Sequence, residues 1–348
     1  KQKKIALKEL PSSRIFPQKA AYILEPKSDS ARDFVDAINK DIIEKTDDLR
    51  FKEFAKVAHT ALPALIAPGI IGFDSVKKAV AIQLFSKEKI HILLLGDPGT
   101  GKTKILDAAT KMHPISSMGV GSGTSGAGLA VTVRGNEVLP GLLPMADRGL
   151  CAIDELNLMK DEARASLYNA MESGFVSYSK GGKHIRFDAR VSVLATANPK
   201  GDRFKGSDPG ELRKQMPFDP ALLSRFHLTF FVRRPDVKMF KHISKQLLSN
   251  KKDKIPEQDL AFVKRYIKRA NDIKDVSLPK RFEQEVVDFL AEIKTEEDKH
   301  LIEVSPRLVV GFMRMAKALA RSELRNSVED KDIQTVKQIV KESIRLDT

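Results

Sequence analysis

The sequence predicts an α/β protein with a mainly parallel sheet, followed by a smaller all-helical domain. Short apolar segments suited to strands alternate with helical patterns at 91–96, 149–154, 190–198 and 228–233. Such alternation is typical of parallel sheets, because their strands are joined by crossover helices. Beyond Pro235 the strand candidates stop and amphipathic helical patterns continue to Thr348. A glycine-rich turn directly after the first strand candidate, and before a helical pattern, also supports this fold class.

The N-terminal part is predicted to be an arm followed by helices. Residues 1–30 combine prolines and charges without steady periodicity, which indicates a linker or arm. From Ser30 to Ile43 the apolar residues fall on one helical face, with Ser30 as the cap. Two further helical patterns, at 48–65 and 73–85, are separated by the helix-breaking stretch APGIIG.

Composition narrows the function classes. Lys and Arg number 60 against 46 Asp and Glu, and the net charge of +14 favours a polyanionic partner if the excess lies on one face. The single cysteine, Cys151, excludes an internal disulfide framework and a cysteine-based zinc site. No apolar run approaches the ~20 residues that span a bilayer. We expect a soluble, intracellular protein that does not act in a membrane, and a longer parent chain because the sequence begins at Lys.

The glycine-rich turn predicts a nucleotide cradle. GDPGTGKT fits the pattern G-x-x-x-x-G-K-[ST] and lies between a strand and a helix, as phosphate binding requires. Lys102 is expected to reach the β and γ phosphates of ATP, and the Thr103 hydroxyl to ligate Mg²⁺. The predicted nucleotide-binding residues are Gly96, Asp97, Pro98, Gly99, Thr100, Gly101, Lys102 and Thr103.

Two later strand candidates end in polar residues suited to ATP hydrolysis. Asp154 and Glu155 follow an apolar run, at the edge where α/β sheets bind ligands. We expect Asp154 to hold Mg²⁺ and Glu155 to act as general base on the attacking water. Asn198 ends the next strand candidate, where it would orient that water or begin an Asn-Pro turn; the two roles are compatible.

At this point the chain resembles the AAA+ motor domain of the minichromosome maintenance (MCM) replicative helicases, most closely the archaeal ones. The resemblance lies in HILLLGDPGTGKT, GSGTSGAGLAVTVRG, LLPMADRGLCAIDEL, SYSKGG, VSVLATANPKGDRF, PFDPALLSRF and SPRLVVGFMRMAKALARSELR. It implies an AAA+ P-loop NTPase, an αβα sandwich over residues 31–235, with a helical lid domain over 236–348. It also implies an ATP-dependent DNA helicase that acts in replication, in the cytoplasm or nucleoid of an archaeon, or in a eukaryotic nucleus.

The resemblance further implies a homo-oligomeric ring, a hexamer, with ATP between neighbouring subunits. Arg225 in LLSRF matches the arginine finger, and Arg307 in SPRLV matches the second-sensor arginine that this family donates across the interface. A guanidinium suits the role because it stabilises the charge spread over the transferring phosphoryl oxygens. An ordinary salt bridge is the alternative for each.

Two inserts are expected to meet DNA. In residues 174–190, apolar side chains alternate on either side of Gly181-Gly182, which predicts a β-hairpin with its turn at these glycines. His184 and Arg186 lie on the returning strand. The resemblance makes this the pre-sensor hairpin in the ring channel, with Lys180 and Lys183 near its tip. It also makes residues 119–143 the helix-2 insert, with Arg134 near its tip. Lysine–phosphate contacts bind DNA without sequence preference.

The chain departs from the family pattern at two places. Gly101 and Thr103 replace the usual Ala and Ser around the loop lysine, and LNLM follows the acidic pair in place of Phe-Asp-Lys-Met. The second departure is closer to magnesium-chelatase and MoxR-like ATPases, which share the inserts. A remodelling ATPase with a protein client is therefore the alternative function. The zinc-bearing N-terminal domain typical of the family is not found in this sequence.

Overall fold

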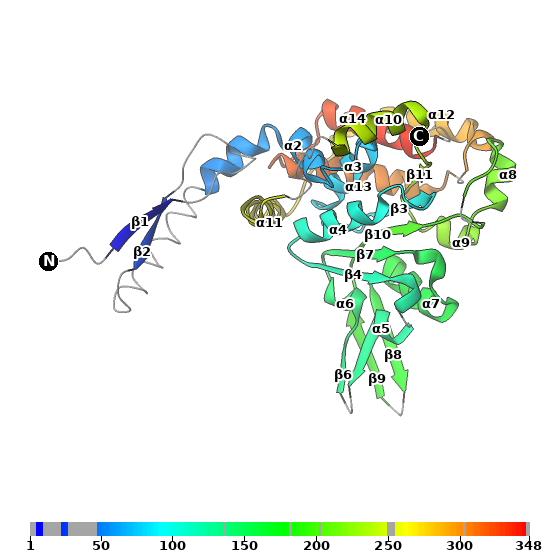
Figure 1. Ribbon diagram of the computed structural model, residues 1–348, viewed down its shortest axis with the longest axis horizontal. Coiled ribbons are helices and arrows are strands. Elements are labelled where there is room, and N and C mark those ends of the chain that lie inside the picture. Colours follow the sequence, from blue (N-terminus) through cyan, green and yellow to red (C-terminus); the bar gives the residue numbers. More distant parts are fainter. Residues whose placement is uncertain are drawn as a thin grey trace.

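The computed structural model describes residues 5–9, 22–26, 47–124, 126–134, 137–180, 183–201, 203–248, 255–301 and 304–345 (Figure 1). The helix predicted from Ser30 to Ile43 lies outside these ranges. Within the described ranges, no helix is both long enough and apolar enough to cross a membrane.

A five-stranded, fully parallel sheet forms the centre of the molecule. Its strands are β3 (His91–Gly96), β4 (Ser116–Val120), β7 (Leu150–Asp154), β10 (Ser192–Ala197) and β11 (Leu228–Val232). Their order is β11-β3-β10-β7-β4, and every neighbouring pair is parallel. This confirms the predicted fold class. Four of the strands are buried along their whole length, as their continuous apolar runs require in a sheet covered on both faces.

The edge strand β4 was not predicted. Its sequence, SSMGV, offers only two apolar side chains and lacks the pattern of a buried strand. It forms because it pairs in parallel with β7, with Ser116 opposite Leu150 and Val120 opposite Asp154. Pairing with an already buried neighbour thus supplies what the local sequence does not.

Helices pack on both faces of the sheet and give it an αβα layering. Successive residues of β3 point to opposite faces: Ile92 and Leu94 join one core cluster, whereas Leu93 and Leu95 join the other. The first cluster includes α3 (Asp74–Gln83) and α4 (Lys102–Met112). The second includes α7 (Asp161–Ser173).

The N-terminal helices differ from the prediction in one respect. The single helix expected over 48–65 is two helices, one over 47–55 and α2 (Ala58–Leu65). The first ends in a tighter turn, in which the Val57 N–H donates to Phe54 O at 3.0 Å.

Ahead of these helices, β1 (Ile5–Glu9) and β2 (Tyr22–Pro26) pair antiparallel within the segment expected to be an irregular arm. Their sequences, IALKE and YILEP, contain enough apolar residues to form short strands.

The helices after Pro235 share a core with the sheet. They are α10 (Val237–Leu248), α11 (Glu257–Asn271), α12 (Glu283–Thr295), α13 (Pro306–Ser322) and α14 (Asp330–Ser343). Buried residues of α11, α12, α13 and α14 belong to the same cluster as Ile92 and Leu94 of β3. Tyr266 of α11 is central to it: its ring lies 4.8 Å from that of Phe54, and its hydroxyl donates to Ser322 O at 2.6 Å.

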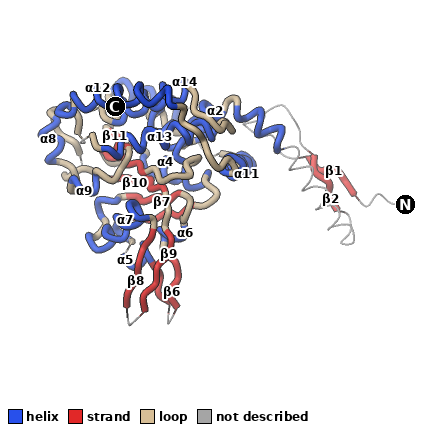
Figure 2. The backbone as a smooth tube through the Cα atoms, turned by 180° about the vertical axis from the view of Figure 1, so that it is seen from behind, coloured by secondary structure: helices blue, strands red, loops and turns tan. Residues whose placement is uncertain are grey.

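Two antiparallel hairpins project from the same side of the body (Figures 1 and 2). One is formed by β5 (Val131–Arg134) and β6 (Glu137–Pro140), between the short helices α5 (Gly126–Ala130) and α6 (Leu142–Met145). The other is formed by β8 (Phe175–Lys180) and β9 (Lys183–Asp188). Both views place the two hairpins side by side, far from the lid helices.

Candidate active site

The phosphate cradle lies at the carboxyl end of β3. Gly99 and Gly101 have φ angles of 77° and 90°, values that favour glycine. Lys102 is the first residue of α4, and its ammonium donates to Gly96 O at 2.8 Å and to Asp97 O at 2.6 Å. Burial lowers the Lys102 pKa to about 8, opposed by the charges of Asp97, Asp154 and Glu155. The lysine therefore folds over the loop that the sequence assigned to phosphate.

The structure brings Thr103 and Asp154 together. The Thr103 hydroxyl donates to Asp154 Oδ2 at 2.9 Å, so a residue after β3 meets the last residue of β7. The other carboxylate oxygen, Oδ1, accepts from the Thr196 hydroxyl. A hydroxyl and one carboxylate, with no larger cluster of His, Cys, Asp or Glu among the described residues, is a donor set that fits Mg²⁺, which completes its shell with water and phosphate oxygens.

Glu155 is fixed by its backbone. It has a φ of 52°, in the left-handed region, and its N–H donates to Thr196 Oγ1 at 2.9 Å. Its carbonyl lies against Gly121, where a Cβ atom would come within 2.1 Å of Glu155 O. Two tertiary contacts thus hold an unfavourable backbone conformation at Glu155, directly after Asp154, the carboxylate expected to hold Mg²⁺.

Asn198 follows β10 at the same edge of the sheet. Its N–H donates to Asn157 Oδ1 at 3.0 Å, which ties it to the short 3₁₀ helix Leu156–Leu158 after Glu155. Thr196, two residues earlier, also contacts Asp154 and Glu155 but was not among the predicted site residues. Since alternate residues of a strand share a face, its position relative to Asn198 was the available signal.

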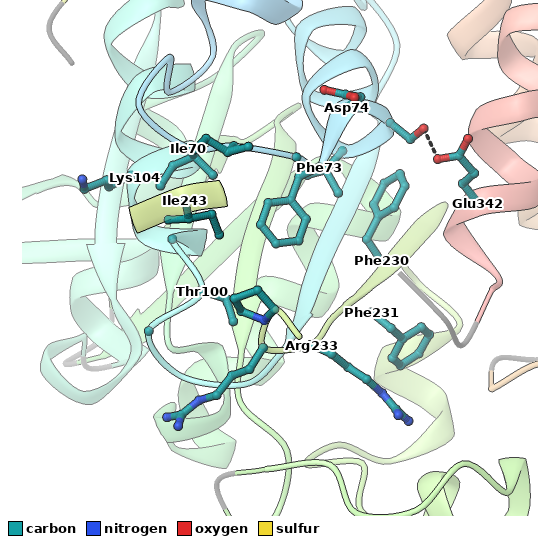
Figure 3. Close-up of a pocket in the computed structure, with 18 of the residues that line it drawn as sticks. Ile70, Phe73, Asp74, Thr100, Lys104, Phe230, Phe231, Arg233, Ile243 and Glu342 are labelled. Atoms are coloured by element: carbon teal, nitrogen blue, oxygen red, sulfur yellow. Dashed lines mark hydrogen bonds between the residues drawn. The ribbon is translucent and has the colours of Figure 1, made fainter. Parts of the chain in front are cut away.

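Beside the cradle lies a cavity of about 1240 Å³ (Figure 3). Its wall is formed by the stretch before α3, by the phosphate loop, by the end of β11 with the residues after it, and by α10 and α14. Ile70, Phe73, Phe230 and Ile243 give it apolar sides, whereas Arg233 lies at its lower rim in this view. Across its top, the Ser75 hydroxyl donates to Glu342 and links α3 to α14. Sequence reasoning did not find this cavity, because its lining comes from segments far apart in the chain.

Asp97 of the phosphate loop connects the loop to two other segments. It is buried, and its carboxylate accepts the N–H of Phe204 at 3.1 Å and the N–H of Arg234 at 3.1 Å. These segments follow β10 and β11, respectively. The side chain therefore has a structural task beyond its place in the loop motif.

Arg225 and Arg307 lie together at the opposite edge of the sheet. Arg225 comes three residues before β11, whose first residue, Leu228, pairs with Ile92 near the start of β3. Arg307, the second residue of α13, approaches Ser224 O with its Nη1 at 3.4 Å. Since β3 has six residues, about 17 Å of strand separates this edge from the phosphate loop. The two arginines thus lie at the same end of the sheet, where both approach Glu172, and do not reach the cradle of their own chain.

Several cationic side chains surround His227 at the arginine edge. Burial, together with the charges of Arg314, Arg307 and Lys89, lowers the pKa of His227 to about 3. The His227 ring is thus neutral near pH 7, and the positive charge resides on the arginines and lysine.

The predicted DNA-binding residues flank the two hairpin turns. Arg134 pairs with Glu137 across the first hairpin, and Lys180 pairs with Lys183 across the second. The side chains of Arg134, Lys180 and Lys183 lie outside the described part of the chain, as do residues 135, 136, 181 and 182. Nearer the base of the second hairpin, Arg186 stacks on Phe175, with 3.7 Å from Cζ to the ring centroid.

A parallel sheet with a glycine loop between β3 and α4, and a hydroxyl–carboxylate pair beside that loop, defines a P-loop nucleoside triphosphatase. Comparison with protein families makes the assignment specific: the MCM P-loop domain matches residues 48–251 and the MCM AAA-lid domain matches residues 261–344. The chain belongs to the minichromosome maintenance family.

Curated relatives come from eukaryotes and archaea. The chain is 30% identical over 318 residues to the DNA replication licensing factor mcm7-B of Xenopus laevis, a match covering 83% of this chain and 44% of that protein. It is 28% identical over 333 residues to the minichromosome maintenance protein MCM of Saccharolobus solfataricus, covering 88% and 48%. The chain thus spans about half the length of the curated relatives it matches.

Proposed function

We propose that this chain is the ATP-hydrolysing motor of an MCM ring that moves along DNA and unwinds it during replication. The observation that carries the proposal is the separation of the two halves of the site: the cradle lies at one edge of the sheet and the arginine pair at the other. A nucleotide in the cradle can meet such arginines only on a second copy. A head-to-tail contact of this kind closes into a ring, here a homo-hexamer.

The cavity beside the cradle supports ATP as the substrate. Its apolar sides suit the base, and its continuity with Gly99, Thr100 and Gly101 directs the phosphates toward Lys102. Thr103 and Asp154 would hold Mg²⁺, which neutralises charge on the phosphate oxygens when bound. Glu155 would take the proton of the attacking water, with Asn198 orienting that water. Arg225 and Arg307 of the next subunit would stabilise the charge of the transferring group.

The hairpins support DNA as the partner. They extend from one side of the body, and Lys180 and Lys183 occupy the strand positions beside the turn of the second hairpin. Lysines at the tips of projecting hairpins would bind phosphates regardless of sequence, with Arg134 of the first hairpin beside them. The chain has four tyrosines and no tryptophan, so electrostatic contact outweighs base stacking. Such a motor works inside the cell, in the nucleoid or nucleus.

The test measures ATP turnover with and without single-stranded DNA. We expect Glu155→Gln to lower turnover by at least about a hundredfold while ATP still binds. We expect Lys180→Ala with Lys183→Ala to retain basal turnover and to lose its stimulation by DNA. Wild-type turnover that is indifferent to DNA, together with failure to separate a forked duplex, would replace the helicase with a motor that remodels a protein client.

A further inference from the structure

We infer that Glu172 is a positioning residue that holds Arg225 and Arg307 in one arrangement for the nucleotide of the next subunit. This inference rests on the proposed function and adds to it a residue that the phosphate and metal motifs do not include. Glu172 Oε2 lies 3.2 Å from Arg225 Nη2, and Oε1 lies 3.7 Å from Arg307 Nη2. One carboxylate therefore binds both guanidiniums, with one oxygen for each.

The three residues come from three separate parts of the chain. Glu172 lies at the end of α7, Arg225 in the loop between α9 (Pro220–Leu223) and β11, and Arg307 at the start of the lid helix α13. Two guanidiniums that approach the same carboxylate carry like charges, which repel each other. The carboxylate offsets one positive charge and leaves the pair with one net positive charge for a phosphate. It also joins the lid to the sheet domain at the point where both arginines emerge.

The helix itself does not explain Glu172. A carboxylate in the last turn of a helix opposes the helix dipole, so this position is unfavourable for helix stability. One turn earlier on the same face, Tyr168 stacks under Arg225, with 4.6 Å from Cζ to the ring centroid. The Arg225 guanidinium is thus contacted on one face by the Tyr168 ring and at its Nη2 by the Glu172 carboxylate.

Arg225 retains donors for a further acceptor. Its Nη1 donates to Ala221 O and its Nη2 to Glu172, and each of these nitrogens carries a second N–H. A guanidinium has five N–H donors in one plane, so an approaching phosphate oxygen can be bound while Glu172 stays in place. The side chain is 19% exposed, so part of it remains accessible.

The test is Glu172→Gln, which keeps the shape of the side chain and removes its charge. At saturating ATP we expect kcat to fall about tenfold to a hundredfold, because misplacement of the arginines affects the transition state most. The affinity for ADP is expected to stay within about twofold, because the cradle belongs to the other edge. The melting temperature is expected to be unchanged, because the Glu172 side chain is 56% exposed.

Glu88→Gln is the matched control. Glu88 is 52% exposed and also joins the lid to the sheet domain, through Arg314 at 3.1 Å, but it contacts neither Arg225 nor Arg307. We expect this variant to keep wild-type kcat. A second readout separates positioning from general structure: in an Arg307→Ala background, Glu172→Gln should cause a smaller loss of kcat than in the wild type, because only one arginine is left to position.

Mixing subunits completes the test. Glu172→Gln subunits have an intact cradle, and Lys102→Ala subunits have intact arginines, so a mixture should recover turnover that neither variant shows alone. If wild-type kcat is retained or exceeded in Glu172→Gln while Arg225→Ala is inactive, Glu172 has no positioning role and the proposed function stands. If the wild-type protein lacks ATP turnover, or Arg225→Ala is fully active, the proposed function itself fails.

Discussion

Lys102 is the residue whose charge in the cradle depends most on pH near neutrality. Its pKa is lowered from 10.5 to about 8, with desolvation as the main cause. In the free protein, the ammonium therefore begins to lose its proton near pH 7 and is about half deprotonated at pH 8. Bound phosphate favours the charged form and raises the pKa again. Above about pH 7, nucleotide binding must therefore be increasingly coupled to uptake of a proton.

We expect the Kd for ATP to rise by up to about twofold from pH 7 to 8 and by up to about a further fivefold between pH 8 and 9. Calorimetry at pH 8.5 in two buffers of different ionisation enthalpy should show the proton uptake directly. The Lys102→Arg variant is the control, because a guanidinium stays charged over this range and removes the pH dependence, whatever its absolute affinity. A wild-type Kd that is flat to pH 9 would contradict the assignment.

At the scale of elements, the edge strand β4 determines how Glu155 is held. β4 ends at Val120, opposite Asp154, and the next residue, Gly121, lies against the Glu155 carbonyl. The close approach requires a residue without a side chain. A strand with little local strand character thus supports the backbone of the proposed general base.

Gly121→Ala is expected to abolish ATP turnover, because its Cβ would lie 2.1 Å from Glu155 O and would displace that residue. The same 3₁₀ turn supplies the control: a Cβ at Gly123 would have no atom within 4 Å, so Gly123→Ala should remain active. Phosphate release by the two purified variants is the measurement. Equal activity would show that Glu155 tolerates movement of its backbone.

Sequence reasoning reached the elements whose information is local. The strands β3, β7, β10 and β11 are apolar runs, and the cradle is a contiguous motif, so each could be predicted from neighbouring residues. The strand β4, the Thr196 hydroxyl and the Glu172 carboxylate could not, because their roles arise from pairing or contact with distant segments. The cavity of Figure 3 belongs with these, since its walls come from the stretch around α3, the phosphate loop, the residues around the end of β11, and α14.

At the scale of the whole molecule, the sheet domain and the lid share one hydrophobic core. Buried residues of the helices after Pro235 contact the cluster that contains Ile92, Leu94 and Val80. Hydrogen bonds reinforce the junction, including Arg321 Nη1 to Phe85 O at 3.0 Å and Arg314 Nη1 to Lys89 O at 2.6 Å. The helical lid domain predicted after Pro235 is confirmed by the family match over residues 261–344, and its helices pack into the same core as the sheet.

Phe312 on α13 tests whether this shared core unfolds as one unit. It is buried against Phe289, with 5.9 Å between ring centroids, and Phe312→Ala should lower the free energy of unfolding by about 3–5 kcal/mol. Scanning calorimetry should show a single transition displaced as a whole. The partly exposed Val309 of the same helix is the control, and Val309→Ala should cost under about 1 kcal/mol. A separate low-temperature lid transition beside an unchanged second one would contradict the shared core.

The placement of cradle and arginine pair at opposite ends of one sheet has a kinetic consequence. If each working centre is completed by two molecules, specific activity depends on how many molecules are assembled and not only on how many are folded. Dilution should then lower the ATP turnover per molecule even when every molecule is correctly folded, and concentrating the protein should restore it. Progress curves started from a dilute stock should accordingly show a lag that shortens as more protein is added.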